Sequence, residues 1–187
     1  ISGNTGTGVV KASGIYGAGT FTLNMASNWW GAVNGPLNAT TNPAGTGNSV
    51  DDGVKYSPWV ASSGTDYDGG TVGWQPDLHA VGVSTNGTIQ EGVDLVVGST
   101  VYIAAGTYAG QVVMSGFANL NMIGAGIGAT IVTPPPTMMT HYFMTSDTNR
   151  AIMSVEYSAV VKISHLTVNG LGLGNSNYRF NGIGYLH

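Results

Sequence analysis

The sequence predicts an all-β fold, and within that class a parallel β-helix, a solenoid with one short capping α-helix near residues 88–97. Three observations lead to this prediction. The chain holds 30 glycines among 187 residues, well above the usual fraction of about 7%. Apolar segments of strand length recur at intervals of roughly 8–11 residues, separated by glycine and asparagine, as short strands do. Helical periodicity is confined to a single stretch.

That helical stretch is "TIQEGVDLVV". Thr88 can accept a hydrogen bond from the first turn while Glu91, three residues later, reaches back to it, which is the capping-box pattern. Ile89, Val93 and Val96 follow at the spacing of one helix face. We therefore expect a short amphipathic helix at this point of the chain.

The remaining apolar segments have the composition of short strands. An antiparallel sandwich and a parallel β-helix both contain strands at this spacing, but asparagines at the corners favour the β-helix, because stacked amides can hydrogen-bond from turn to turn in ladders. The corner asparagines are Asn119, Asn121, Asn169, Asn175, Asn177 and Asn181. The predicted strands lie in "TFTLNM" (20–25), "TVYIAAGTY" (100–108), "QVVMSG" (111–116), "LNMIGAG" (120–126), "TIVTP" (130–134), "AIMSVEY" (151–157), "VVKISHLTVNG" (160–170) and "NGIGYLH" (181–187).

From residue 88 the sequence "TIQEGVDLVVGSTVYIAAGTYAGQVVMSGFANLNMIGAG" resembles the N-terminal cap and first turns of right-handed parallel β-helix proteins of the pectin-lyase-like superfamily. "ISHLTVNG" (163–170) is similar to a further turn. The earlier segments "NWWGAVNGP" (28–36), "NPAGTGNSVDDGVKYSPWV" (42–60) and "GTDYDGGTVGWQPDL" (64–78) resemble the closing end of such domains in large bacterial secreted proteins. The resemblance implies an architecture but not an activity, since one fold hosts many functions.

The closing signature therefore precedes the opening signature. We expect closing turns of one β-helix over 1–60, a linker over 61–87, and a capping helix with opening turns over 88–187. Uncapped solenoid ends invite pairing with another chain. The sequence thus predicts either part of an adhesin-like array or a subunit that polymerises head to tail into a filament or sheath. The expected interface and end-closing residues are Ile1, Val9, Val10, Trp29, Trp30, Trp59, Gly182, Ile183, Tyr185 and His187.

The tryptophans allow two interpretations. Exposed, they would be a platform on which sugar rings stack; buried, they would close the end of the core, each burying roughly 150–250 Å². All four lie in the segments that resemble a closing end. This position favours the end-closing role.

Catalysis is not indicated. The resemblance implies polysaccharide lyases, hydrolases or esterases that work with clustered acids and often Ca²⁺, yet residues 100–187 hold only Asp147 and Glu156 as acids. Glycoside hydrolysis needs paired carboxylates, so we expect a protein that is not an enzyme. No cofactor is expected apart from a candidate Ca²⁺ site, because turns rich in aspartate and glycine can supply oxygen ligands. Its residues would be Asp51, Asp52, Asp66 and Asp68.

The composition limits the classes of binding partner that can be expected. The net charge is −4 and only five residues are Lys or Arg, which disfavours nucleic-acid binding. No apolar run approaches the roughly 18 residues of a membrane span. A chain without cysteine whose surface must be built from Asn, Ser, Thr and Gly is expected at the cell surface or secreted. The alternative function is a carbohydrate-binding module or a degenerate polysaccharide lyase, with a polysaccharide as partner. "NAT" (38–40) and "NGT" (86–88) match the N-glycosylation pattern, which arises by chance in such a sequence.

Overall fold

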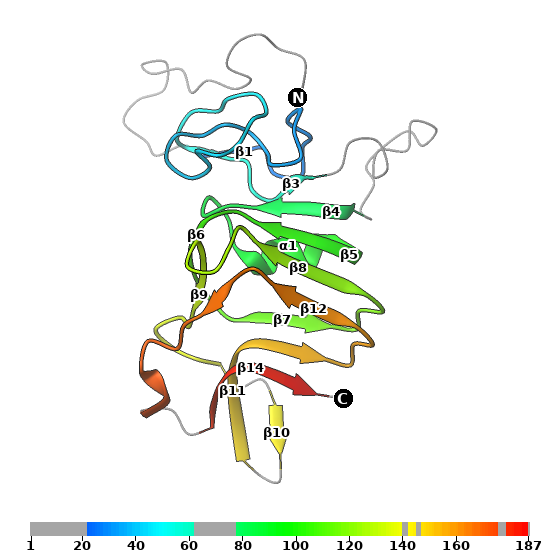
Figure 1. The fold of residues 1–187 in the computed structure, drawn as a ribbon, viewed down its shortest axis with the longest axis vertical. Helices are drawn as coiled ribbons and strands as arrows, with labels where there is room; N and C mark the ends of the chain where they lie inside the picture. The colour runs from blue at the N-terminus through cyan, green and yellow to red at the C-terminus, as the bar shows by residue number, and fades with distance from the viewer. Residues whose placement is uncertain (1–21, 62–77, 140–141, 145–146, 176–178, 187) are drawn as a thin grey trace.

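The computed structural model describes residues 22–61, 78–139, 142–144, 147–175 and 179–186 (Figure 1). These residues form short strands, a single α-helix and one 3-10 turn, so the predicted all-β class is confirmed. The elements are β1 (Leu23–Asn24), β2 (Val54–Lys55), β3 (Trp59–Val60), β4 (Leu78–Val83), α1 (Ile89–Leu95), β5 (Val96–Ile103), β6 (Gly106–Ala109), β7 (Val112–Ser115), β8 (Leu120–Gly124), β9 (Thr130–Thr133), β10 (Tyr142–Met144), β11 (Asp147–Glu156), β12 (Val161–Ser164), β13 (Thr167–Val168), the 3-10 turn η1 (Leu173–Asn175) and β14 (Phe180–Leu186).

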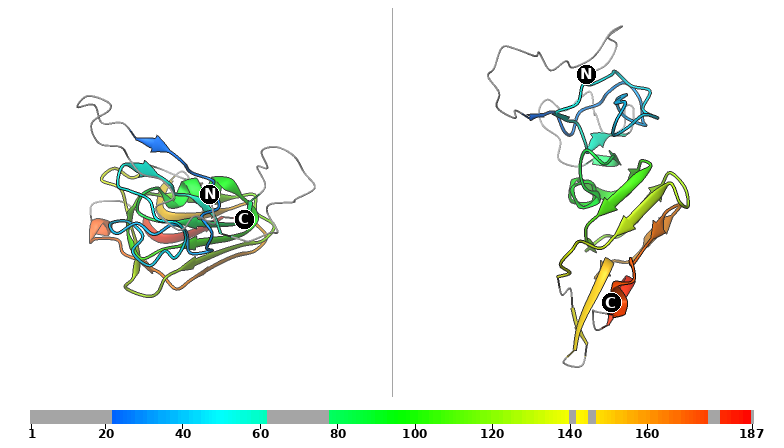
Figure 2. Two further views of the ribbon diagram at one scale, coloured as in Figure 1. Left: turned by 90° about the horizontal axis from the view of Figure 1, so that it is seen from above. Right: turned by 90° about the vertical axis from the view of Figure 1, so that its left-hand side faces the viewer.

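The strands from β5 onward form three small sheets, and the chain visits them in the same order on each pass. The first pass is β5, β6, β7, the second β8, β9, β11 and the third β12, β13, β14. Each strand pairs in parallel with its counterpart on the next pass. The passes lie one below another along the long axis, with the described N-terminal and C-terminal residues at opposite ends (Figures 1 and 2).

The predicted helix is confirmed as α1. Thr88 is its N-cap, and the Thr88 side chain accepts from the Glu91 main chain while the Glu91 carboxylate accepts from Thr88. Ile89 and Val93 are buried against the sheets. Gly92 allows this close packing, because a Cβ at that position would lie 2.5 Å from Cγ2 of Val83.

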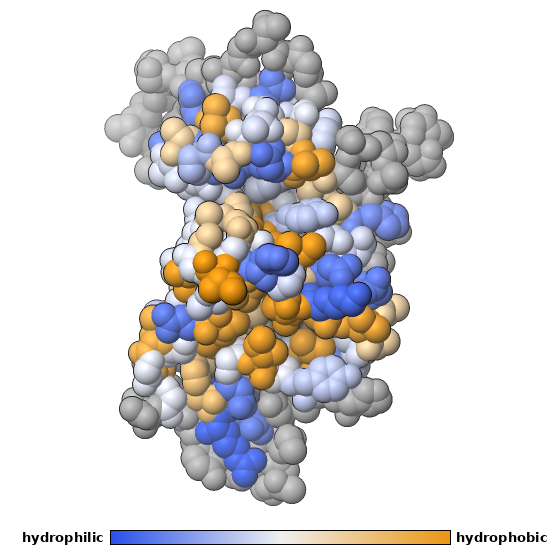
Figure 3. Space-filling view, viewed as in Figure 1, coloured by the Kyte–Doolittle hydropathy of each residue, from blue (hydrophilic) through white to orange (hydrophobic). Residues whose placement is uncertain are grey.

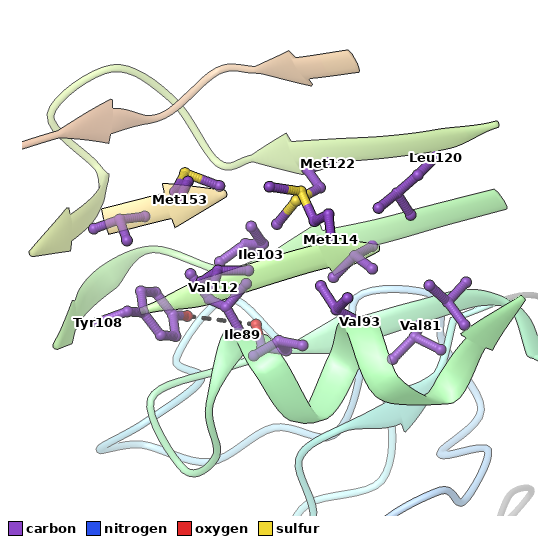
Figure 4. Packing of buried hydrophobic residues seen from close by; sticks show 14 of the residues in the cluster. Val81, Ile89, Val93, Ile103, Tyr108, Val112, Met114, Leu120, Met122 and Met153 are labelled. Atoms are coloured by element: carbon purple, nitrogen blue, oxygen red, sulfur yellow. Dashed lines mark hydrogen bonds between the residues drawn. The ribbon is translucent and has the colours of Figure 1, made fainter. Parts of the chain in front are cut away.

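The main core lies between the sheets and α1 (Figure 4). It forms because side chains alternate along a strand, so every second residue points inward. Val101 of β5 and Met122 of β8 are partners in register and are both fully buried. The fully enclosed apolar side chains of this core include Val81, Val83, Val101, Met114, Leu120, Met122, Ile152 and Met153.

Residues 22–61, called here the N-terminal layer, cover the end of the sheets at which the passes begin (Figure 1). β1 and β2 pair in parallel, and β3 pairs antiparallel with β4, which itself pairs in parallel with β5. The layer has its own small core of Trp30, Val50, Tyr56, Trp59 and Ala61.

Two expectations need correction. The stretch 61–87 is not a linker throughout, because its residues 78–83 form β4 and join the largest sheet. The alternation "LHAVGV" places Val81 and Val83 in the core, and this burial favours a strand. The asparagine ladder also fails at Asn121, whose register partners are Thr100 and Lys162. Asn169 and Asn181 instead bond the main chain two residues away.

Candidate interface at the edges of the sheets

The three strands of the last pass, β12, β13 and β14, form what we call the open edge. Each pairs with one neighbouring strand, and no further strand of the described residues covers its other side. A strand edge left in this way presents unpaired N–H and C=O groups. Figure 1 shows β12 below β8 and β14 below β11, each on the side of its neighbour that faces away from the N-terminal layer.

Burial of the inward side chains falls at this edge. In the largest sheet, Val101 and Met122 are fully buried, but Ile163, the next residue of the same column, is only partly buried. In the sheet of β7, β11 and β14, Met153 of β11 is fully buried, whereas its register partner Ile183 of β14 is 50% exposed. An inward side chain is covered by the passes on both sides of it, so the last pass leaves apolar surface in contact with water.

Tyr185 shows the same change more strongly. Its partners in the column, Met114 and Val155, are buried, while Tyr185 is 58% exposed. The Tyr185 hydroxyl reaches the carbonyl of Ser158 at 3.4 Å. Ile183 and Tyr185 were among the predicted interface residues, and the structure places them side by side at the open edge with Gly182.

The opposite edge is covered in two of the three sheets, while β6 of the remaining sheet pairs only with β9 among the described residues. In the largest sheet, β3 pairs with β4. In the third sheet, the Gln90 side chain of α1 takes the place of a strand beside β7: its Oε1 accepts from the Val113 N–H at 2.7 Å and its Nε2 donates to the Val113 carbonyl at 3.1 Å. Both main-chain groups of Val113 are thereby satisfied without a neighbouring strand. The two edges therefore differ in kind.

The aromatic cluster of the N-terminal layer is buried. Trp30 is 0% and Trp59 2% exposed, and Tyr56 lies between them at ring-centre distances of 6.4 and 6.2 Å. The Trp59 Nε1 donates to the Val33 carbonyl at 3.1 Å, whereas the buried Trp30 Nε1 bonds to no group within the described part of the chain. Neither indole offers a free face, so these two tryptophans do not form the exposed sugar platform that was one interpretation of the sequence. Trp29 is partly buried.

The Trp59 indole fits between two glycines. A Cβ on Gly35 would lie 2.4 Å from its Cε2, and a Cβ on Gly82 of β4 would lie 2.1 Å from the same atom. Gly35 also has φ of +79°, which side chains rarely adopt. The two glycines thus let the indole join the N-terminal layer to β4.

Polar groups complete this junction. The Tyr56 hydroxyl lies 2.6 Å from Thr41 Oγ1 and accepts from Ser84 Oγ at 3.1 Å. Burial raises the pKa of Tyr56, and the hydrogen bonds from Ser84 and Thr41 offset part of that rise. Asn86 accepts from the Tyr56 N–H at 2.8 Å and donates to the Val54 carbonyl at 3.1 Å. The layer is therefore tied to the β4–α1 turn by specific bonds.

Glu91 adds the one ion pair found among the described residues, with Lys55 of β2. Burial by itself raises the pKa of Glu91, but the hydrogen bonds from Lys55 and Thr88 together outweigh it and hold the pKa below its usual value. Because Glu91 also closes the capping box, one carboxylate links the cap of α1 to the N-terminal layer.

The predicted calcium ligands are only partly covered by the structure. Asp51 and Asp52 lie in the turn before β2, and the Asp52 carboxylate accepts from Asn38 Nδ2 and Thr40 Oγ1, both at 3.1 Å. Among the described residues no three His, Asp or Glu side chains gather closely enough to hold a metal ion. Asp66 and Asp68 lie outside the described residues, as do the predicted interface residues Ile1, Val9, Val10 and His187.

Comparison with protein-family models, with curated proteins and with solved structures found no match. The resemblance to the pectin-lyase-like superfamily therefore stays a prediction. No helix in the described part of the chain has the length and apolar character needed to cross a membrane.

Sequence reasoning missed Gln90 and Tyr102. Gln90 sits on the polar face of a short helix, where nothing in the sequence distinguishes an edge-covering amide from a solvated one. Tyr102 sits at an outward position of β5, between the buried Val101 and Ile103, and is 43% exposed. Strict alternation in "TVYIA" could have identified it as an exposed aromatic side chain.

Proposed function

We propose that this protein is a structural, extracellular, right-handed parallel β-helix module that is lengthened at its open edge by a further turn of parallel strands. The observation that carries the proposal is the fall in burial from Met153 to Ile183 and from Val155 to Tyr185 on inward columns of the same sheet. A further turn would cover these side chains and pair the free strand edges.

The β-helix interpretation rests on the repeated visiting order of the three sheets and on the parallel pairing of successive passes. Connections between parallel strands of one sheet are right-handed in about 98% of cases, which supports the handedness. A crystal structure in which the three sheets do not enclose one common core would contradict it.

The asymmetry of the two edges supports a structural role. Proteins generally cover or interrupt their free strand edges, and here the edge near α1 is covered by β3 and Gln90. β12, β13 and β14 lack such covers among the described residues. A second copy added head to tail would give a filament or sheath, and further turns of a longer chain would give an adhesin-like array.

The proposal includes the absence of catalysis and an extracellular location. The support is compositional: charged residues make up only 7% of the chain, so its surface is built largely from neutral polar side chains. Incubation with neutral and acidic polysaccharides, followed by reducing-end and unsaturated-product assays, tests the first point. Turnover by the purified chain would contradict it.

Assembly is tested by sedimentation velocity and negative-stain electron microscopy over a series of concentrations. We expect elongated oligomers, with hydrogen-exchange protection of 161–164 and 180–186 rising as they form. Ile183→Lys places a charge on the open edge and should abolish both effects. Met139→Lys is the matched control, because Met139 is 71% exposed and its main chain bonds Gln111 just before β7, a strand of the first pass that does not pair with β14. A monomer at every concentration, with unprotected edge strands, would contradict self-assembly.

A further inference from the structure

A groove runs between the N-terminal layer and the outer surface of β5 and β8. Its volume is about 470 Å³, within the range of roughly 300–1,000 Å³ of ligand sites. We call it the side groove. It is lined by Val33, Asn34, Asn42, Pro43, Ala44, Trp59, Ala61, Tyr102, Ile103, Ala104, Ala105, Ile123, Gly124 and Ala125. Apolar residues gather on this face over β5 and β8 in Figure 3.

The floor of the side groove is apolar. It is built from the ring of Tyr102, which is 43% exposed, and from small residues at the corners that follow β5 and β8, such as Ala105 and Ala125. The Tyr102 hydroxyl makes no hydrogen bond to the described residues, which leaves it free to pair with a ligand. No lining residue carries a charge.

The wall formed by the N-terminal layer is held rigidly. Asn42 is buried, and its Nδ2 donates to the carbonyls of Asn34 and Pro36 at 2.9 and 2.8 Å. The Asn34 Nδ2 donates to the Ala44 carbonyl at 2.6 Å. Because this wall is already fixed, little conformational entropy is lost when a ligand binds against it.

We propose that the side groove binds a neutral carbohydrate whose ring stacks on Tyr102. The groove is open on one side, since Val33 is 54% exposed as well, so a bound molecule keeps one face in water. A wholly apolar ligand would leave apolar surface in water there. A neutral sugar ring instead places its C–H face on the aromatic ring and its hydroxyls toward water and the Tyr102 hydroxyl. The uncharged lining favours neutral sugars over uronates.

This proposal is independent of assembly at the open edge. The test is isothermal titration calorimetry of the full chain with hexasaccharides of β-1,4-glucose, β-1,4-xylose, β-1,4-mannose and α-1,4-galacturonate. At least one neutral hexasaccharide should bind with measurable heat, while the galacturonate should not. Saturation-transfer NMR should show contact through the ring C–H protons.

Three variants locate the site. Tyr102→Ala should raise the dissociation constant by about tenfold or more, as expected when an aromatic anchor is truncated. Ala125→Trp should fill the groove and abolish binding. Tyr157→Ala, which removes a tyrosine that is 79% exposed after β11 and outside the groove, should leave binding unchanged. Melting curves of all three check that the fold is intact.

The proposal would be overturned if none of the four hexasaccharides bound at concentrations up to about 10 mM, ten times a dissociation constant of about 1 mM. An affinity that Tyr102→Ala does not change would also overturn it. So would preferential binding of galacturonate. Binding of the neutral apolar dye Nile red in place of the sugars, lost in Ala125→Trp, would identify the groove as an apolar docking site and would equally overturn it.

Discussion

Gly82→Ala tests how the N-terminal layer is attached to the sheets. A Cβ at this position of β4 would lie 2.1, 2.3 and 2.4 Å from Cε2, Nε1 and Cζ2 of Trp59, far inside the roughly 3.5–4.0 Å of carbon–carbon contact. The indole or the strand must therefore move. We expect a loss of about 1–3 kcal/mol in the free energy of unfolding, as for an overpacked core.

The companion variant removes the other partner. Trp59→Ala should cost about 3–5 kcal/mol, because a fully buried indole is lost and a cavity remains. In the double variant the new methyl group occupies part of the vacated space, so Gly82→Ala should cost nearly nothing in that background. The two losses should then fall short of additivity by about 1–3 kcal/mol, which is the cost of the steric overlap.

Urea denaturation at pH 7 and 25 °C, followed by far-ultraviolet circular dichroism, measures all four members of the cycle. Gly110→Ala is the control, because a Cβ there meets no atom within 4 Å, and it should change stability by no more than about 0.5 kcal/mol. Additivity within about 0.5 kcal/mol, or an unaltered stability of Gly82→Ala alone, would refute the contact between β4 and the indole.

Three further predictions concern the α1 end of the molecule. Folding lowers the pKa of Glu91. The ionised carboxylate therefore stabilises the fold at pH values above its ordinary pKa of about 4.3, and this stabilisation is lost as the pH falls through the lowered pKa. Melting curves of Glu91→Gln and the parent chain should differ at pH 7 and converge in acid. Asn38→Ala should lower the free energy of unfolding by about 1–3 kcal/mol in urea denaturation, because the buried Asn38 amide donates to the Val50 carbonyl, which would be left unpaired. Gln90→Ala should lower stability by about 1–3 kcal/mol in urea denaturation, because it leaves main-chain groups of β7 unpaired.

Local features of this chain could be predicted from its sequence. The capping box of Thr88 and Glu91 and the apolar stripe of α1 depend on residues within one or two turns, so the pattern determines the structure. The strands over 100–108, 111–116, 120–126 and 130–134 are also marked by short-range alternation, and the structure has β5 to β9 there.

The relations between distant segments were decided by the tertiary structure. Alternation shows that Ile183 faces inward, but its 50% exposure depends on whether another pass lies beside β14. The strand within the expected linker is stabilised by β5 and by Trp59 across the sheet, and no local pattern encodes those contacts. The side groove likewise joins Val33 to Tyr102. The sequence by itself determined the helix and the strands from β5 to β9, because those choices are local. Only packing between passes determined which edges are covered, because burial is a property of neighbours that lie far apart along the chain.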